Sequence, residues 1–197
     1  EMLDEATAQE ACKGDIEHAR VYLSLPAENA MQAIEIFRRA VQDNQLAATA
    51  LKGVVAGKLV RALAKSSREA YVPSPDMLKK LGLSPEKVKT LYRHRTHVEV
   101  NKKVVPCPES GGTGFVGQIG VFELYSIGSD EKAAIAQGDI NALATAMRKQ
   151  GVPSIQQAAL IRAVEGETSV DEVIRVTVGA QKSKPAGAKP KPATAEA

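Results

Sequence analysis

Residues 105–125 read VPCPESGGTGFVGQIGVFELY and carry the strongest structural signal in the chain. A Cys-Pro pair comes first, glycines follow at positions 111, 112, 114, 117 and 120, and an apolar run that contains Glu123 ends the stretch. Clustered glycines favour tight turns with positive φ, whereas β-branched and aromatic residues favour a pleated strand. The stretch therefore predicts a knuckle-like turn that leads into a β-strand over 119–124.

Composition limits the class of protein. The chain has 197 residues, of which 44% are hydrophobic and 4% aromatic, with no Trp, so we predict an aliphatic, Ala-rich core in one domain or two small ones. A net charge of +3 does not indicate a nucleic-acid-binding protein, and no apolar run approaches the roughly 20 residues of a membrane helix. Two cysteines, Cys12 and Cys107, make no disulfide framework, which favours a reducing, cytoplasmic setting.

The glycine-rich stretch resembles the C-terminal part of the hexameric ATPases of type II secretion and type IV pilus assembly. There the pattern is Cys-x-x-Cys, then Gly-Thr-Gly-aromatic-x-Gly-Arg-x-Gly-hydrophobic-Phe-Glu. The residues that match are Cys107, Gly112, Thr113, Gly114, Phe115, Gly117, Gly120, Phe122 and Glu123. Ser110 stands at the second Cys and Gln118 at the Arg.

The resemblance extends over residues 1 to about 178. A segment at 55–64, VAGKLVRALA, is similar to a family segment that contains an Arg, matched here by Arg61. The closing helices of the family are matched at Gly151, Gly166, Thr168, Ser169, Glu172 and Val173. The last of these predicted helices begins with a Ser/Thr-x-x-Glu capping box that ends at Glu172.

The nucleotide side of the family is poorly represented. Its Walker B glutamate is matched by Glu1, which makes Glu1 the candidate catalytic residue, although a solvated terminal carboxylate is the alternative. The surrounding layout is matched at Asp4, Thr7, Ala8, Ala11 and Ala30, but Leu3 replaces an Arg, Ala6 a second Glu, and Ala19 and Pro26 two His residues. Alanine and proline side chains cannot donate to a phosphate or hold Mg²⁺. The family's phosphate-binding loop would precede Glu1, so we expect no cofactor on this chain alone, and ATP and Mg²⁺ for the full-length family.

Two motifs imitate phosphate-binding loops. Residues 53–59 read GVVAGKL, which has three residues between the glycines instead of four and Leu where Ser or Thr should bind Mg²⁺. Residues 112–117 spell GxGxxG, but a strand rather than a helix is predicted after them, so they do not fit a dinucleotide fingerprint. We discount both.

The resemblance also implies a zinc site, because the family carries two Cys-x-x-Cys pairs here. Four thiolates in such pairs bind structural zinc. In this chain the four positions are Ala64, Ser67, Cys107 and Ser110, so one thiol remains. We therefore predict no metal, with His94, His97 and Cys107 as the one alternative ligand set.

The periodicity of apolar residues predicts mostly helices. Val21–Leu25 and 96–105 are predicted as additional strands, and the order of helices and strands is typical of an α/β sheet with parallel strands. The predicted helices span residues 1–13, 29–44, 45–65, 74–82, 84–92, 129 onwards, 140–150, 154–164 and 168 onwards. The Lys/Pro/Ala segment from Gln181 to Ala197 lacks apolar residues and is predicted to be disordered.

We therefore expect an α/β fold: the C-terminal part of a RecA-like P-loop ATPase core, with a small helix/strand excursion and a C-terminal helical bundle. The predicted divisions are 1–63 for the partial core, 64–112 for the metal-free excursion, 113–178 for the strand and helices, and 179–197 for the tail. Gly112, Gly114, Gly117, Gly120, Glu123 and Arg61 are the expected structural motif residues.

The functional expectation follows from the resemblance. The chain is interpreted as a fragment or degenerate copy of a secretion or pilus-assembly ATPase, whose family couples ATP hydrolysis to pilus or pseudopilus assembly. Expected partners are further copies in a hexamer and an inner-membrane platform protein, with no nucleic acid, at the cytoplasmic face of the inner membrane. The alternatives are a catalytically silent scaffold or regulatory subunit and, on the tail alone, a basic adaptor.

Overall fold

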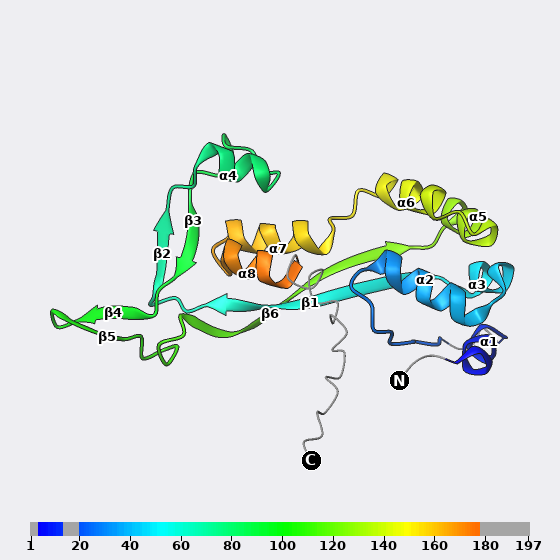
Figure 1. The fold of residues 1–197 in the computed structure, drawn as a ribbon, viewed down its shortest axis with the longest axis horizontal. Helices are drawn as coiled ribbons and strands as arrows, with labels where there is room; N and C mark the ends of the chain where they lie inside the picture. The colour runs from blue at the N-terminus through cyan, green and yellow to red at the C-terminus, as the bar shows by residue number, and fades with distance from the viewer. Residues whose placement is uncertain (1–3, 14–19, 178–197) are drawn as a thin grey trace, which may run out of the picture.

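The computed structural model describes residues 4–13 and 20–177 (Figure 1). In chain order the elements are α1 (Glu5–Lys13), α2 (Ala30–Val41), α3 (Asn44–Ala50), β1 (Gly53–Leu63), β2 (Arg68–Tyr71), α4 (Pro75–Lys80), β3 (Leu91–His94), β4 (His97–Val100), β5 (Lys103–Pro106), β6 (Phe115–Ser126), α5 (Ser129–Gln137), α6 (Ile140–Lys149), α7 (Ile155–Val164) and α8 (Val170–Thr177). The mixed α/β class is as predicted. Glu1 and the tail from 178 lie outside the described residues.

Strands β1 and β6 form a long antiparallel ladder, which is the central element of the fold. It pairs Gly53 with Ser126 at one end and Leu63 with Phe115 at the other, with an irregularity near Arg61. Helices α2, α7 and α8 pack against this ladder, which Figure 1 shows in the middle of the molecule and along its long axis. The glycine-rich turn leading into a strand is therefore confirmed, whereas the expected parallel pairing is wrong for the described strands, which pair only in antiparallel fashion.

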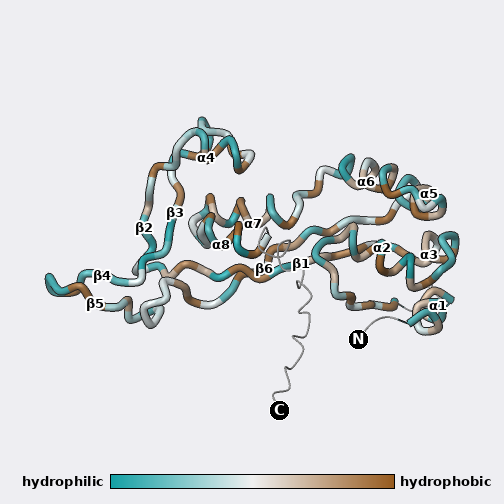
Figure 2. The backbone as a smooth tube through the Cα atoms, in the orientation of Figure 1, coloured by the Kyte–Doolittle hydropathy of each residue, from teal (hydrophilic) through white to brown (hydrophobic). Residues whose placement is uncertain are grey.

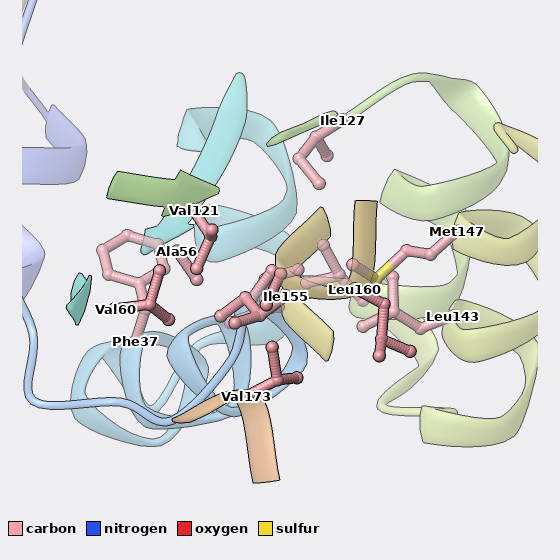
Figure 3. Close-up of a cluster of buried hydrophobic side chains, with 14 of the residues drawn as sticks. Phe37, Ala56, Val60, Val121, Ile127, Leu143, Met147, Ile155, Leu160 and Val173 are labelled. Atoms are coloured by element: carbon pink, nitrogen blue, oxygen red, sulfur yellow. The ribbon is translucent and has the colours of Figure 1, made fainter. Parts of the chain in front are cut away.

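Small aliphatic side chains fill the core, as composition predicts. Phe37 is the only aromatic residue among the buried hydrophobic residues of the described chain. Figure 3 shows how residues from the ladder, α2, α6, α7 and α8 meet in one cluster, with the labelled side chains of Phe37, Ala56, Val60, Val121, Ile127, Leu143, Met147, Ile155, Leu160 and Val173. The core thus joins the first helices of the chain to its last ones.

The helix predicted over 45–65 is wrong in its second part. Helix α3 ends at Ala50, and residues 53–63 form strand β1. The apolar residues there fit both periods, but Gly53, Gly57 and the β-branched pair Val54–Val55 disfavour helix, and the twelve-residue strand β6 pairs with this segment. The GVVAGKL motif therefore lies in a strand, which still excludes a phosphate-binding loop but for a different reason.

Three other predictions need correction. Val21–Leu25 belongs to no strand ladder in the described part of the chain. Residues 84–92 contain a turn instead of a helix, closed by hydrogen bonds from the amides of Lys87 and Val88 to the Ser84 carbonyl. The single strand expected over 96–105 is a β4–β5 hairpin, because Asn101 and Lys102 both adopt positive φ and reverse the chain.

The excursion is a branch of the structure. The β2–β3 pair with α4 and the β4–β5 hairpin extend away from the ladder in two directions (Figure 1).

Among the described residues, no helix has both the length and the apolar character that crossing a membrane requires. At the other end of the sequence, helices α6, α7 and α8 confirm the predicted order of the helical end.

One face of the ladder is apolar and left exposed by the described residues. Val55, Leu59, Phe122 and Leu124 are each more than half exposed. The Phe122 ring lies across two glycines, because a Cβ built on either Gly57 or Gly120 would meet that ring at 2.5 Å. Figure 2 shows this hydrophobic character along β1 and β6. The helices cover the opposite face, where Ala56, Val60 and Val121 are buried.

Candidate functional site

Two of the residues matched on the nucleotide side, Asp4 and Thr7, cap the start of helix α1. The Asp4 carboxylate accepts hydrogen bonds from the Thr7 amide at 2.9 Å and from the Thr7 hydroxyl at 2.8 Å, at the start of α1. These two bonds, the backbone one foremost, lower the pKa of Asp4. Pro26 lies in the segment before α2, and it offers no side-chain donor. Asp4 and Thr7 are thus satisfied by each other, and this part of the chain shows a structural rather than a chemical use of them.

Glu123 joins the starts of two helices that are far apart in the sequence. Its side chain is buried in β6, with 4% of the residue exposed. One carboxylate oxygen accepts a hydrogen bond from the Ala30 amide of α2 at 2.6 Å, and the other accepts one from the Ile155 amide of α7 at 3.1 Å. The first amides of a helix have no partner within the helix and carry partial positive charge, so a carboxylate is a favourable acceptor there. The predicted motif residue Glu123 is therefore a shared cap for α2 and α7.

Arg61 and Glu172 bind β1 to the last helix. The Glu172 side chain is fully buried and accepts hydrogen bonds from the Arg61 guanidinium at 2.7 and 3.0 Å and from the Arg61 amide at 3.0 Å. Arg175, one turn along α8, binds the same carboxylate at 2.6 and 2.7 Å. Burial alone would raise the pKa of Glu172, but the hydrogen bonds from Arg175 and Arg61 outweigh it and lower that pKa to about 2.

This contact corrects the predicted capping box. The Glu172 amide donates to the Ser169 hydroxyl at 3.3 Å, as a capping box requires, but the Glu172 carboxylate turns to the two arginines instead of back to the helix start. Thr168 adds a second link, because its hydroxyl donates to the Arg61 carbonyl at 2.8 Å. Arg61 also stacks on Phe115, with its guanidinium carbon 4.2 Å from the ring centroid. The family-matched residues at 61, 115, 168 and 172 thus lie close together in the fold.

The knuckle brings the four zinc positions of the family together around one thiol. Cys107 is buried, and its sulfur lies 3.4 Å from the Ser66 hydroxyl. Hydrogen bonding from Ser110 is the main cause that lowers the pKa of the Cys107 thiol from its ordinary 9.0 to about 6. The Ala64 amide donates to the Gly114 carbonyl at 3.1 Å, which closes the knuckle on itself.

These residues do not fit a structural zinc ion. One thiol, two serine hydroxyls and an alanine methyl replace the four soft ligands that such a site needs. Within residues 4–13 and 20–177, no three His, Cys, Asp or Glu side chains gather closely enough to hold a metal ion, so His94 and His97 do not complete a site with Cys107. His94 instead packs on Phe115, with ring centroids 4.8 Å apart. Hydrogen bonds among hydroxyls, backbone and one thiol hold the knuckle in the metal's place.

The motif glycines have separable reasons to be glycine. Gly112, Gly114 and Gly117 all adopt positive φ, a conformation that costs other residues energy. At Gly114 a Cβ would also meet the Arg95 carbonyl oxygen and the His94 Cβ at 2.8 Å. Gly120 does not need positive φ but leaves room for the Phe122 ring. The glycine pattern therefore specifies both the turn and the surface of the strand that follows.

Sequence reasoning missed the partners of these residues. Ser66 donates its hydroxyl proton to Glu109, and its amide also donates to that carboxylate at 2.9 Å, which ties the two halves of the knuckle together. Glu131, buried at the start of α5, accepts from the Gly128 amide at 3.0 Å and from Gln150 at 2.7 Å. The only sequence signal for Glu131 is its place in a first turn, and none pointed to the Ser66–Glu109 pair.

The lowered thiol pKa gives a testable prediction. Because Ser66 donates its one proton to Glu109, we expect Ser110 to be the main donor to the Cys107 thiolate. In a Cys12→Ala background, thiolate absorbance should titrate near pH 6, and Ser110→Ala should move that midpoint upward towards 9.0. A midpoint close to 9.0 in both proteins would contradict the hydroxyl arrangement.

Comparison with known proteins shows the family to which this architecture belongs. The family described as Type II/IV secretion system protein matches residues 1–175 of the chain. The chain belongs to this family. That match includes the knuckle, the ladder, Glu123 and the Arg61–Glu172 contact, so the resemblance carried by the glycine-rich stretch is confirmed. The fold, with mixed helices and strands, is accordingly a piece of a domain of this secretion-system family.

Individual secretion-family relatives are similar over most of this chain. The type IV pilus assembly ATPase PilB of Thermus thermophilus is 27% identical over 180 residues, covering 90% of this chain and 19% of PilB. Type II secretion system protein E of Pectobacterium carotovorum is 29% identical over 177 residues, with 90% and 33% covered. Type II secretion system ATPase E of Vibrio cholerae is 27% identical over 178 residues, with the same shares. The chain thus spans about a third or less of the length of these three relatives.

Proposed function

We propose that this chain is a structural part of a type II secretion or type IV pilus assembly ATPase, in which a full-length protein couples ATP hydrolysis to pilus or pseudopilus assembly. The observation that carries the proposal is the family match over residues 1–175, which includes the ladder and its two carboxylate contacts. The part of this role that the chain supplies is mechanical: it holds helices, ladder and knuckle in fixed relation.

The bare surfaces support a role within a larger assembly. The apolar ladder face at Val55, Leu59, Phe122 and Leu124 has no cover among the described residues. Beside it, a groove of about 950 Å³ lies between the extended segment at 20–25, α2 and the start of β1. Large exposed apolar surfaces mark contact sites in soluble proteins. We propose that further polypeptide of the ATPase packs here, as in a RecA-like core that this chain completes only in part.

The expectations about the nucleotide, the hexamer and the membrane partner concern the full-length protein. ATP and Mg²⁺ would be held by residues beyond the described part of this chain, with Glu1 as the candidate Walker B-like carboxylate. A hexamer and contact with an inner-membrane platform protein at the cytoplasmic face are proposed from the family alone. The predicted divisions at 1–63, 64–112, 113–178 and 179–197 are likewise proposals, of which the branch formed by β2–β5 and α4 supports the second.

A catalytically silent scaffold or regulatory subunit is the second candidate. The side chains at Pro26 and Ala6 favour it, because neither can act on a γ-phosphate. Such a subunit would retain the surfaces for assembly without turnover. The two candidates differ in what the full-length gene product does with nucleotide.

Nucleotide assays separate these candidates. We expect residues 1–197 alone to show no ATP turnover and no saturable binding of a fluorescent ATP analogue, because the chain contains no GxxxxGK[ST] cradle for the phosphates. The same assays on the full-length gene product should show both activities for a motor. Absence of turnover together with absence of binding in that product would remove the motor and leave the scaffold. Saturable ATP binding by residues 1–197 would contradict the assignment of this chain to a structural part.

A further inference from the structure

Glu123 connects two parts of the chain that its own sequence neighbours do not connect. The Ala30 amide lies 93 positions before it and the Ile155 amide 32 positions after it, yet each donates to one oxygen of the same buried carboxylate. A carboxylate is planar, so its two oxygens move together. A displacement of one helix start must therefore change the hydrogen bond of the other or break its own.

Each of the two helix starts also has a cap of its own. The Asn29 side chain accepts from the Gln32 amide at 2.9 Å, and the Ser154 hydroxyl accepts from the Gln157 amide at 3.3 Å. These local caps satisfy the third amide of each helix and leave the first amide, of Ala30 or of Ile155, to Glu123. Glu123 adds a connection that is not local, and it lies at the junction of ladder, α2 and α7.

The connection continues beyond α7. The Arg68 guanidinium donates to the Gly166 carbonyl at 3.2 Å, and the Leu63 amide donates to the Glu167 carbonyl at 2.8 Å, so the segment after α7 contacts the base of the excursion. Helix α8 then holds Arg61 through Glu172. The start of α2, by contrast, directly follows the extended segment that contains Pro26.

We propose that Glu123 is a positioning residue that couples the start of α2 to the start of α7. Through it, a movement of the segment before α2 changes the position of α7, and with it the contacts of α8 and of the excursion. The coupling is a property of this chain and needs no nucleotide. If the chain works within a motor, Glu123 places the arm at 20–29 and the excursion in one mechanical unit, and this second statement rests on the proposed function.

Hydrogen–deuterium exchange on residues 1–197 tests the coupling. Asn29→Ala should speed exchange at 30–33 about tenfold, as loss of a helix cap does, and should also speed exchange at 155–158 by a smaller factor of about three. Ser154→Ala should act in the reverse direction, because coupling between two sites is reciprocal. Exchange in α5, which packs mainly on α3 and α6 rather than on α2 or α7, serves as the reference for general destabilisation.

The same two substitutions in a Glu123→Gln background complete the test. An amide offers only one acceptor oxygen, so one helix start loses its connection. The local effects should stay and the remote effects should fall to no change. The matched control is Glu131→Gln, since Glu131 is similarly buried but accepts from the Gly128 amide and from Gln150 rather than from the start of α2 or α7, and it should leave the remote effects in place.

Two results would overturn the proposal. Confinement of each substitution to its own helix start in the otherwise unchanged chain would show two independent caps that share an acceptor. Remote effects that persist at full size in the Glu123→Gln background, where the second acceptor oxygen is gone, would show that another route carries them. Because Asn29 and Ser154 are surface caps, their substitutions in the otherwise unchanged chain decide the first point even where Glu123→Gln fails to fold.

Discussion

Replacing Glu172 by alanine should lower the free energy of unfolding by about 3 kcal/mol, the low end of the range for breaking a buried ion pair. The carboxylate is fully buried, and its loss leaves the Arg61 amide without its acceptor and a void where the side chain packed. Arg61 and Arg175 are each about half exposed, so water can solvate their guanidinium groups after the substitution. That access to solvent is why we do not expect the upper end of the range. Urea denaturation of the two proteins, monitored by circular dichroism, measures the difference.

The pH dependence identifies the charge as the cause. The pKa of Glu172 is lowered from 4.5 to about 2, so the folded state binds its proton more weakly than the unfolded state does. The stability from this carboxylate is therefore fully present above pH 4.5 and is lost as the pH falls towards 2. Glu172→Gln has no titrating group there, so the stability gap between wild type and this variant should narrow between pH 4.5 and 2. The gap is the quantity to follow, because other carboxylates titrate in both proteins.

Glu165→Ala is the matched control for Glu172→Ala. Glu165 is about half exposed and pairs with Arg162 at 3.3 Å on the surface of the molecule. Exposed pairs of this kind contribute about 0.5 kcal/mol or less. A cost for Glu172→Ala as small as that of the control would show that the Arg61–Glu172 contact does not bind α8 to the ladder.

Local signals were sufficient wherever a residue acts within its own segment. The helices predicted to begin at Asn29 and Ser154 do begin there, each capped by that residue, and the predicted glycine-rich turn before β6 has positive φ at its glycines. The strand over 119–124 followed from its β-branched and aromatic residues. These features depend on neighbours within a few positions, which a sequence displays directly.

The features that the sequence did not show depend on pairing between segments that are far apart in the chain. Residues 53–63 are apolar at both helical and strand periods, and the long β6 partner settled the choice. Val21–Leu25 has strand residues but finds no ladder in the described chain, so propensity alone did not make it a strand. Glu123 and Glu172 were singled out by resemblance, but the amides that donate to them from other elements lie between 32 and 111 positions away. Contacts between residues so far apart in the chain produce no periodic pattern in the sequence, so only the structure could show these two contacts.

Gly114→Ala should lower the free energy of unfolding by about 3 kcal/mol, because it combines two costs. The residue adopts φ +78°, and an L residue there is strained by about 1–2 kcal/mol. The added Cβ would also lie 2.8 Å from the Arg95 carbonyl oxygen and from the His94 Cβ. Both of these atoms belong to or adjoin the backbone, so they can give way only if the knuckle shifts.

Gly117→Ala separates those two costs. Gly117 adopts φ +73°, nearly the same conformation, but a Cβ there would meet no atom within 4 Å. We therefore expect this variant to lose only the conformational part, about 1 kcal/mol, in the same urea experiment. The excess cost at Gly114 measures how tightly the knuckle closes without a metal ion, since His94 and Arg95 reach it from the end of β3. Equal costs at the two glycines would mean that the knuckle opens easily, and the hydrogen bonds around Cys107 would then not hold it shut.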